Sequence, residues 1–452
     1  MAAASARRDR RSAAYPGRVR SPLVLVTAVA ALAAVACSAG TRPGAGRMET
    51  PAAASPGTGP ARPASAAPVA VTARVPGCST AAAPAPVLHT VSTSMEPVPG
   101  TPFGVAITAD GRWAFVALTG SGSVGVFRVR GPGVPALARQ VATGEQLLGE
   151  ALTRDGRYLL AADAGGGAAV ISVSRAESGG PGALLGTLGG ESIDGAIEVA
   201  VSPDGRFAFV SLEDTASIAV FNLQRALVRG FGPSDFVGTI PVGLAPVGLA
   251  VSPDGRWLYA TSEIAGQVPK AARSGRLVPR EVPQPVQGTQ GTLTVISLRR
   301  AENDPAGSVV STVLAGCSPV RVIASADGSV VWVTARESDH LLGFSATRLL
   351  TDPAHSLVAS VEVGEAPVGL ALADHGTRIV VADSNRFQAS GASSSLAVVN
   401  VPAALAGRPA LIGYLPAGGF PREMALEPDG TTLLVANFMS QQLEAVGVAG
   451  LP

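Results

Sequence analysis

A segment that predicts a β-hairpin recurs along most of the chain, and it constrains the fold more than any other feature. In the copy at residues 246–259, alternating apolar residues lead into Asp254-Gly255. Glycine permits the positive φ of a tight turn, and aspartate bonds the backbone that follows it. Trp257, Leu258 and Tyr259 then begin a strand that suits a pleated, buried surface.

Seven copies of this segment align on the turn. Their turn residues are mostly 45 to 54 positions apart, and a larger gap, caused by an insertion, precedes the fifth copy. A third strand follows each hairpin, as in residues 123–129, and a fourth follows in most copies. Four antiparallel strands per repeat of this length predict an all-β, seven-bladed β-propeller. The turn residues are Asp110, Asp155, Asp204, Asp254, Asp327, His375 and Asp429.

The seventh repeat, aligned with the others on its turn, contains only three predicted strands. Residues 87–93, near the beginning of the repeats, are available as a fourth. If they form the outer strand of the last blade, the ring closes and no sheet edge is left exposed. The sequence therefore predicts a propeller over residues 86–452 that is closed by an N-terminal strand.

The N-terminus is typical of an export signal, because arginines precede an apolar run that ends at Cys37. The run is short for a membrane span, and its end resembles the lipobox of bacterial lipoproteins. We predict a signal peptide over residues 1–37, lipidation at Cys37 and an extracytoplasmic, membrane-anchored protein. Release after ordinary cleavage and an uncleaved anchor are the alternatives. Residues 38–85, rich in Ala, Pro, Gly, Ser and Thr, predict a disordered tether.

Three motifs of the repeats point to a known family. They are residues 246–250, with the sequence Pro-Val-Gly-Leu-Ala, the turn Asp254-Gly255 and residues 434–437, with the sequence Leu-Val-Ala-Asn. Over about residues 87–448 the chain resembles the YVTN-type β-propeller repeats of extracytoplasmic proteins, which include lactonase-like seven-bladed propellers. The resemblance implies the fold more than an activity, because such propellers include enzymes, redox proteins and binding scaffolds.

The innermost strand of each blade lines the central channel of a propeller. Six residues before the turn, four repeats carry glycine, whereas blades three, five and seven carry a charge. Two carboxylates and a guanidinium that converge there could bind a polar ligand or place an acid–base pair beside an anion clamp. Alternatively, the arginine neutralises both carboxylates in a salt-bridged plug, and both readings stay open. The charged residues are Glu198, Arg321 and Glu423.

The loops between second and third strands share a face with those that lead into the innermost strands, where propellers usually bind ligands. Two are enlarged, at residues 264–291 and 386–394. Insertions confined to one face commonly mark the binding side of a repeat protein. The first insertion has four basic residues to one acidic residue, so it covers an anionic ligand or is merely solvated. Further candidate ligand-binding residues on this face are Glu213, Glu263, Arg336, Asp383, Asn385, Arg386 and Asn437.

Composition excludes several function classes. A net charge of +1 with 15% charged residues provides no sequence-wide footprint for nucleic acid. With 4 histidines, no HExxH motif and no cysteine pair at metal-site spacing, we predict no metal and no cofactor. We expect a monomeric scaffold that binds a small polar ligand or an exported protein and contacts the membrane only through a lipid anchor.

The alternative function follows from the family resemblance. In a lactonase-like hydrolase, Glu198 or Glu423 would activate water and Arg321 would stabilise the developing oxyanion. A redox partner has less support, because no cofactor ligands are evident.

Two cysteines, Cys78 and Cys317, remain after Cys37, and an oxidising compartment favours a disulfide between them. The predicted propeller, however, places Cys317 on the ligand face and Cys78 near the opposite face, roughly across the ring. About eight extended residues at ~3.3 Å each reach under ~30 Å, which barely spans that separation. The sequence leaves open whether the two cysteines are paired or free.

Overall fold

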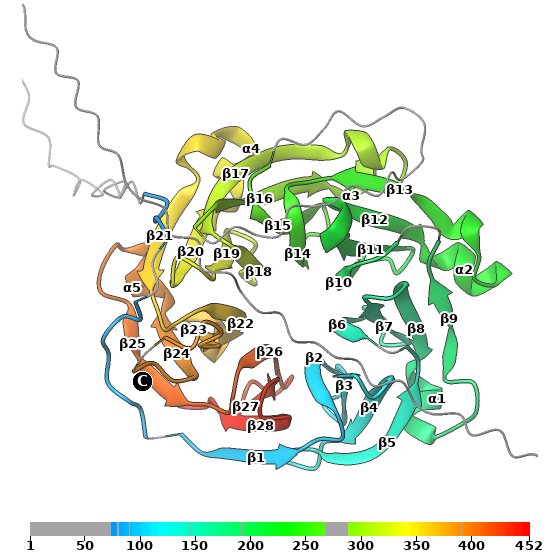
Figure 1. Cartoon of the computed structure of the whole chain (residues 1–452), viewed down its shortest axis with the longest axis horizontal. Helices are drawn as coiled ribbons and strands as arrows, with labels where there is room; N and C mark the ends of the chain where they lie inside the picture. The colour runs from blue at the N-terminus through cyan, green and yellow to red at the C-terminus, as the bar shows by residue number, and fades with distance from the viewer. Residues whose placement is uncertain are drawn as a thin grey trace, which may run out of the picture. The chain divides into compact units, whose positions relative to one another are not determined.

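A computed structural model describes residues 74–78, 81–89, 91–144, 146–190, 193–266, 288–389 and 391–452. Within them, seven four-stranded antiparallel sheets surround a central axis (Figure 1). This confirms the predicted all-β, seven-bladed propeller. The predicted signal peptide, Cys37, residues 38–73 of the tether and residues 267–287 of the blade-four insertion lie outside the described residues.

Each blade runs from an innermost to an outermost strand in chain order, except the last. Blade one contains β2 (Thr101–Ile107), β3 (Trp113–Thr119), β4 (Ser123–Arg128) and β5 (Ala136–Ala142). Blade two contains β6 (Leu147–Leu152), β7 (Tyr158–Asp163), β8 (Gly167–Ser172) and β9 (Leu184–Leu188). Blade three contains β10 (Ala196–Val201), β11 (Phe207–Leu212), β12 (Ser217–Asn222) and β13 (Phe236–Pro241). Blade four contains β14 (Leu244–Val251), β15 (Trp257–Ile264), β16 (Gln290–Ser297) and β17 (Val309–Cys317).

The remaining blades follow the same plan. Blade five contains β18 (Pro319–Ala324), β19 (Val330–Ala335), β20 (His340–Ser345) and β21 (Leu357–Glu362). Blade six contains β22 (Pro367–Ala373), β23 (Arg378–Asp383), β24 (Ser395–Asn400) and β25 (Leu411–Pro416). Blade seven contains β26 (Pro421–Leu426), β27 (Thr432–Asn437), β28 (Gln442–Gly447) and β1 (Thr93–Pro97).

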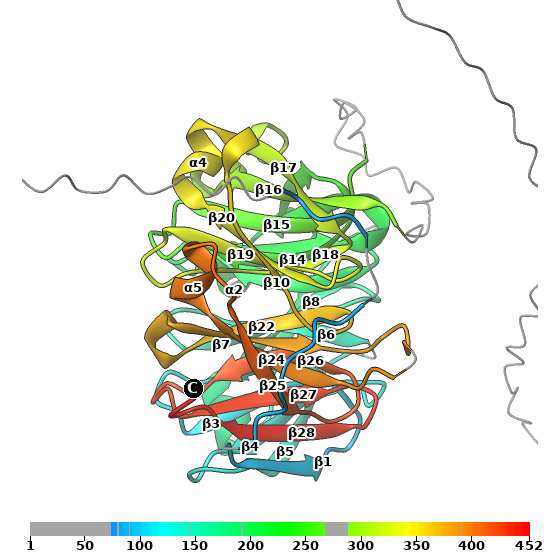
Figure 2. The same ribbon diagram turned by 90° about the vertical axis from the view of Figure 1, so that its left-hand side faces the viewer.

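Short helices follow the third strands of blades two to six. Figure 2 shows α2, α4 and α5 on one side of the ring. None of the helices in the described part of the chain has the length and apolar character that a membrane crossing requires. They are α1 (Val173–Ser178), α2 (Leu223–Arg229), α3 (Leu298–Ala301), α4 (Ala346–Thr351) and α5 (Val401–Leu405). Short 3-10 turns lie at Glu213–Thr215, Pro233–Asp235, Pro305–Gly307, Pro353–His355 and Asp374–Gly376.

A repeated hydrogen-bond pattern explains why the hairpins turn where they do. In blade one, the Thr108 hydroxyl donates to Oδ1 of Asp110 at 2.6 Å, and the same oxygen accepts from the Arg112 amide at 3.1 Å. These bonds lower the pKa of Asp110 to about 2, the Thr108 bond having the larger effect. The next residue, Gly111, has φ 66°, which glycine adopts without strain. The same hydroxyl–aspartate contact recurs in blades two to five.

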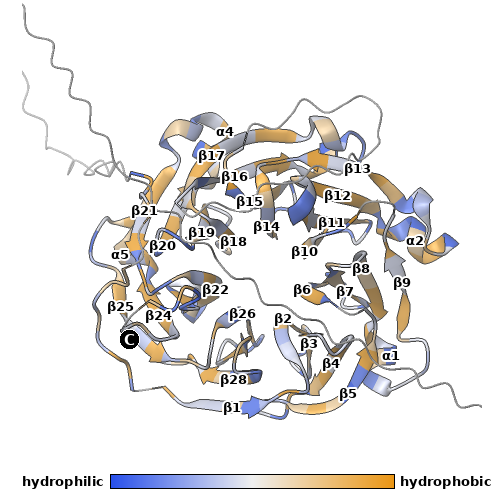
Figure 3. Cartoon of the chain, in the orientation of Figure 1, coloured by the Kyte–Doolittle hydropathy of each residue, from blue (hydrophilic) through white to orange (hydrophobic). Residues whose placement is uncertain are grey.

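The core lies between neighbouring blades. Within the described residues, each pair of adjacent blades shares one cluster of buried apolar side chains, as Figure 3 indicates by the hydrophobic colour of the strands. Phe115 belongs to the cluster of blades one and two, and Trp332 to that of blades five and six. Because burial of one such side chain contributes about 1.5–3 kcal/mol, these interfaces dominate the stability of the ring.

The ring closes as predicted, but with a different strand. β1 pairs antiparallel with β28, from Thr93 opposite Val446 to Pro97 opposite Gln442. The prediction that residues 87–93 form this strand was wrong. An outermost strand has a neighbour on one side only, and four of the five residues of β1 are exposed. Its hydrophobic pattern therefore carries little information about its register.

The N-terminal strap, as we call the described residues 74–78, 81–89, 91 and 92, packs along the outside of blades five and six (Figure 2). The Ala83 amide donates to the Val363 carbonyl at 2.9 Å, and the Tyr414 hydroxyl donates to the Ala83 carbonyl at 2.6 Å. The Leu88 amide donates to the Tyr414 carbonyl at 2.7 Å. The folded unit therefore begins before residue 86, within the segment predicted as tether.

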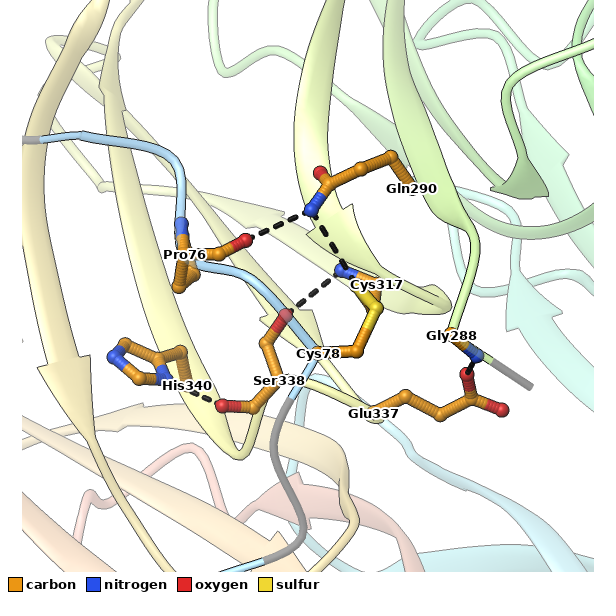
Figure 4. The surroundings of a disulfide bond; sticks show 8 residues. All are labelled: Pro76, Cys78, Gly288, Gln290, Cys317, Glu337, Ser338 and His340. Atoms are coloured by element: carbon orange, nitrogen blue, oxygen red, sulfur yellow. Dashed lines mark hydrogen bonds between the residues drawn. A yellow bond between two sulfur atoms is a disulfide. The ribbon is translucent and has the colours of Figure 1, made fainter. Parts of the chain in front are cut away.

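A disulfide joins Cys78 of the strap to Cys317, with 5.4 Å between the Cα atoms (Figure 4). The expectation that the two cysteines lie on opposite faces was wrong. Because the closing strand begins at Thr93, about fifteen residues at ~3.3 Å each, up to ~50 Å, connect it to Cys78. That length lets the strap pass around blade six and reach the end of β17.

Candidate functional site

The three charged residues of the innermost strands come together and form what we call the channel ion cluster. Arg321 of β18 has its Nε 3.6 Å from Oε2 of Glu198 on β10. The same Nε donates to Oε1 of Glu423 on β26. The side chains are only 6%, 11% and 17% exposed, in that order. One guanidinium thus links three non-adjacent blades across the channel.

Burial changes the ionisation of this cluster. It raises the pKa of Glu198 to about 8, although the charge of Arg321 opposes the shift. The neighbouring Glu150 of β6 is also buried, and burial together with the charge of Glu198 raises its pKa well above the ordinary value. A Cβ atom at Gly149 would lie 2.2 Å from Oε1 of Glu198, so a side chain at this position would displace the carboxyl group from its place.

The raised pKa values predict that the protein loses stability at alkaline pH. The folded state holds a proton on Glu198 up to about pH 8, whereas the unfolded chain releases it near pH 4.5. The contribution of Glu198 to the free energy of unfolding is complete below about pH 4.5. It is lost as pH rises through about 8, at up to ~1.4 kcal/mol per pH unit. Denaturant unfolding between about pH 5 and 9 measures it. Glu198→Gln should flatten the dependence, and an unchanged slope in that variant would contradict the assignment.

Aromatic rings surround a second guanidinium at the channel strands. The Cζ atom of Arg422 lies 3.8 Å from the ring centroid of Phe103, 5.3 Å from that of Phe438 and 5.5 Å from that of Phe420. Burial, followed by repulsion from Arg321, lowers the pKa of Arg422 to about 9. Cation–π contacts are strongest when the cation is desolvated, so these rings stabilise the charge where water does not.

Sequence reasoning missed Arg422 and its aromatic neighbours. The predicted channel residues all occupy the glycine position of the repeats, whereas Arg422 lies one residue earlier. At that earlier position the other six repeats have apolar residues. The single arginine is therefore a departure from the repeat pattern that the sequence itself shows. The apolar residues are Phe103, Leu148, Ile197, Val247, Val320 and Val368.

Two of the predicted loop residues form a buried pair on the loop-rich face. Nη2 of Arg336 lies 2.8 Å from Oε2 of Glu263, and the side chains are 10% and 5% exposed. The Ser318 hydroxyl donates to the same carboxyl oxygen at 3.0 Å. The pair joins blades four and five, and near it the Gly288 amide, at the end of the blade-four insertion, donates to Oε2 of Glu337 at 2.9 Å.

Glu213 and Arg386 lie within the electrostatic reach of this pair. Burial raises the pKa of Glu213, and the charges of Glu263 and Asp214 add to the shift. The Arg386 side chain is exposed, and its Cζ atom lies 6.0 Å from the ring centroid of Phe420. The loop-rich face therefore collects charges of both signs from blades three to six.

The remaining predicted residues support local structure. Ser395 donates to Oδ2 of buried Asp383 at 3.1 Å, and Asn437 donates to Oε2 of buried Glu444 at 2.8 Å. Asn385 accepts from the Ala389 amide at 3.1 Å and so shapes its own loop. These side chains are occupied within their blades and do not join the charges described above. No group of three or more His, Cys, Asp or Glu side chains that could hold a metal ion occurs among the described residues.

Comparison with known proteins supports the fold alone. No protein-family model matches the sequence, and no curated protein matches it. Among solved structures, a chain of Kuenenia stuttgartiensis Hydrazine Synthase is similar with a TM-score of 0.57 and 16% sequence identity. The similarity covers 78% of this chain and 97% of that chain. The propeller fold is thus shared, whereas membership of the YVTN-type family stays a prediction.

Proposed function

We propose that this protein is a binding scaffold that holds an anionic ligand, either a small molecule or a group on another exported protein, on its loop-rich face. The observation that carries the proposal is a pair of guanidiniums beside one aromatic ring. Arg386 and Arg422 lie 6.0 Å and 5.5 Å from the ring centroid of Phe420. Neither belongs to an ion pair within the described part of the chain, unlike Arg321 and Arg336.

The chemistry of these side chains indicates the kind of ligand. A guanidinium presents donors in a fork that matches a carboxylate or phosphate group. Phe420 and Phe438, whose ring centroids are 5.5 Å apart, provide apolar surface beside it. We therefore favour an organic anion with an apolar portion, because both kinds of surface are then used.

The enlarged loops support binding on this side. The first insertion, residues 264–291, follows Glu263 of the buried pair directly in the sequence, and the second, residues 386–394, begins with Arg386 itself. Loops on a rigid scaffold commonly carry recognition in repeat proteins. Export, lipidation at Cys37 and a monomeric state belong to the same proposal, since a tether of residues 38–73 would hold the folded unit near a membrane.

Removal of the unpaired charges is the direct test. Thermal-shift screening of the full chain against organic carboxylates and cell-wall fragments should find ligands that raise the melting temperature. Arg386→Ala should weaken their binding at least ~tenfold, as expected for one charge-assisted contact. Arg408→Ala, on the opposite face, is the matched control. Ligands that bind equally to both variants would place recognition elsewhere and remove the proposal.

A lactonase-like hydrolase is the second candidate, because a buried carboxyl group with a raised pKa beside an arginine is typical of acid–base sites. The same pKa of about 8 keeps Glu198 protonated near neutral pH, so Glu423 would have to act as the base while it is paired with Arg321. Hydrolysis of an aldonolactone, compared between the wild type and Glu423→Gln, decides the question. Equal rates, or none above background, would remove this candidate.

A further inference from the structure

The arginines that the structure describes in blades one to four lie on one side of the ring. We call this side the turn face, because the hairpin turns and the links between third and fourth strands form it, opposite the loop-rich face. Every arginine among the described residues of blades one to four belongs to a turn, a link, the last position of the third strand β4 or the outer strand β5, which contacts a link. They are Arg112, Arg128, Arg130, Arg139, Arg154, Arg157, Arg175, Arg206, Arg225, Arg229, Arg256, Arg299 and Arg300.

Carboxylates on the same turns and links are fewer. There are eight against the thirteen arginines, so this half of the turn face has an excess of about five positive charges. Only Arg112, Arg206 and Arg256 form ion pairs within the described part of the chain, each with the aspartate of its own turn. The carboxylates are those of Asp110, Asp155, Glu177, Asp204, Asp235, Asp254, Glu302 and Asp304.

The other half of the turn face has the opposite balance. In blades five to seven, three arginines on turns and links face five carboxylates. The positive surface is therefore a property of blades one to four and not of the repeat itself. The arginines are Arg348, Arg378 and Arg408, and the carboxylates are those of Asp327, Asp352, Asp374, Glu427 and Asp429.

Two hollows lie within the positive half, on either side of α1. The first, of about 520 Å³, is lined by Arg157 and Arg175, by the single acidic residue Glu177, and by apolar side chains that include Leu185 and Leu227. The second, of about 440 Å³, is lined by Arg139 and again by Arg175. The hollows extend from the outer strand of blade one to α2 of blade three. At the surface of α2, Val228 is 78% exposed between flanking arginines.

We propose that this surface binds an extended acidic segment of another protein, whose carboxylates contact Arg139, Arg157 and Arg175 and whose apolar side chains enter the hollows. Charge complementarity selects the acidic partner and raises its association rate. The concave, partly apolar lining favours a peptide segment over the flat surface of a membrane. The inference does not depend on the proposed function, since the loop-rich face takes no part in it.

The test uses the full chain and a fluorescent peptide rich in glutamate with interspersed leucines, and fluorescence anisotropy measures the affinity. The double variant Arg157→Gln/Arg175→Gln should bind at least ~tenfold more weakly, about the loss expected for two charge pairs at a surface. Arg348→Gln/Arg408→Gln, on the other half of the same face, is the matched control and should change the affinity less than ~twofold.

Three results would overturn the proposal. They are equal binding of a peptide in which glutamine replaces glutamate, an equal loss in the control variant, and binding to anionic vesicles without binding to the acidic peptide. Wild-type binding should also weaken as salt rises from about 50 to about 200 mM, because surface charges are screened. That measurement needs no variant, so the proposal stays testable even if a substitution disturbs folding.

Discussion

Replacement of Arg321 by methionine is expected to lower the free energy of unfolding by about 3–5 kcal/mol, the usual cost of removing one partner from a buried ion pair. Methionine keeps most of the side-chain volume but leaves Glu198 and Glu423 buried without their shared cation. The pKa of Glu198 then rises further, because Arg321 no longer opposes the effect of burial, so the loss should grow with pH. Denaturant unfolding at about pH 6 and pH 9 measures the effect.

The surrounding chain provides controls for this experiment. Arg206→Met removes an exposed guanidinium 3.9 Å from its turn aspartate and should cost less than ~1 kcal/mol. The triple variant Arg321→Met/Glu198→Gln/Glu423→Gln removes all three charges and should recover part of the loss. If Arg321→Met changed stability no more than Arg206→Met, the channel ion cluster would not be a structural plug, and a binding role for it would gain support.

Removal of the disulfide is expected to cost about 2–5 kcal/mol. The Cys78–Cys317 bond joins residues 239 positions apart, so it restricts the unfolded chain over most of the propeller. It also holds the strap against blade four, where the Gln290 side chain donates to the Pro76 carbonyl at 2.8 Å. Cys78→Ser should lower the unfolding midpoint and expose the strap to proteolysis before the blades unfold.

Reduction of the wild-type protein is the matched control for that substitution. Dithiothreitol should reproduce the loss in the wild type and leave Cys78→Ser unchanged, because the bond is already absent there. Mass spectrometry of a non-reducing digest should show one peptide pair joined through Cys78 and Cys317. Full alkylation of both cysteines in the unfolded, unreduced protein would contradict the bond.

The candidate site could be predicted in part from the sequence. Alignment on the turn placed Glu198, Arg321 and Glu423 at one level of the channel, because each repeat unit presents equivalent positions to the axis. It did not separate Glu263 and Arg336, which pair between blades, from Asp383 and Asn437, which bond within their own blades. All four lie at or next to the end of the second strand of a blade. Sequence position alone therefore predicts the same role for each of them.

The number of blades, their four-strand plan and the turn sites were determined by the sequence itself. Each repeat encodes one sheet through local signals, such as Asp254-Gly255 and alternating apolar residues, that do not depend on distant contacts. The tertiary structure alone decided which N-terminal residues close the ring, the pairing of Cys78 with Cys317 and the aromatic surroundings of Arg422. These features join residues far apart in the chain, and their cause is packing across blades, which no single repeat contains.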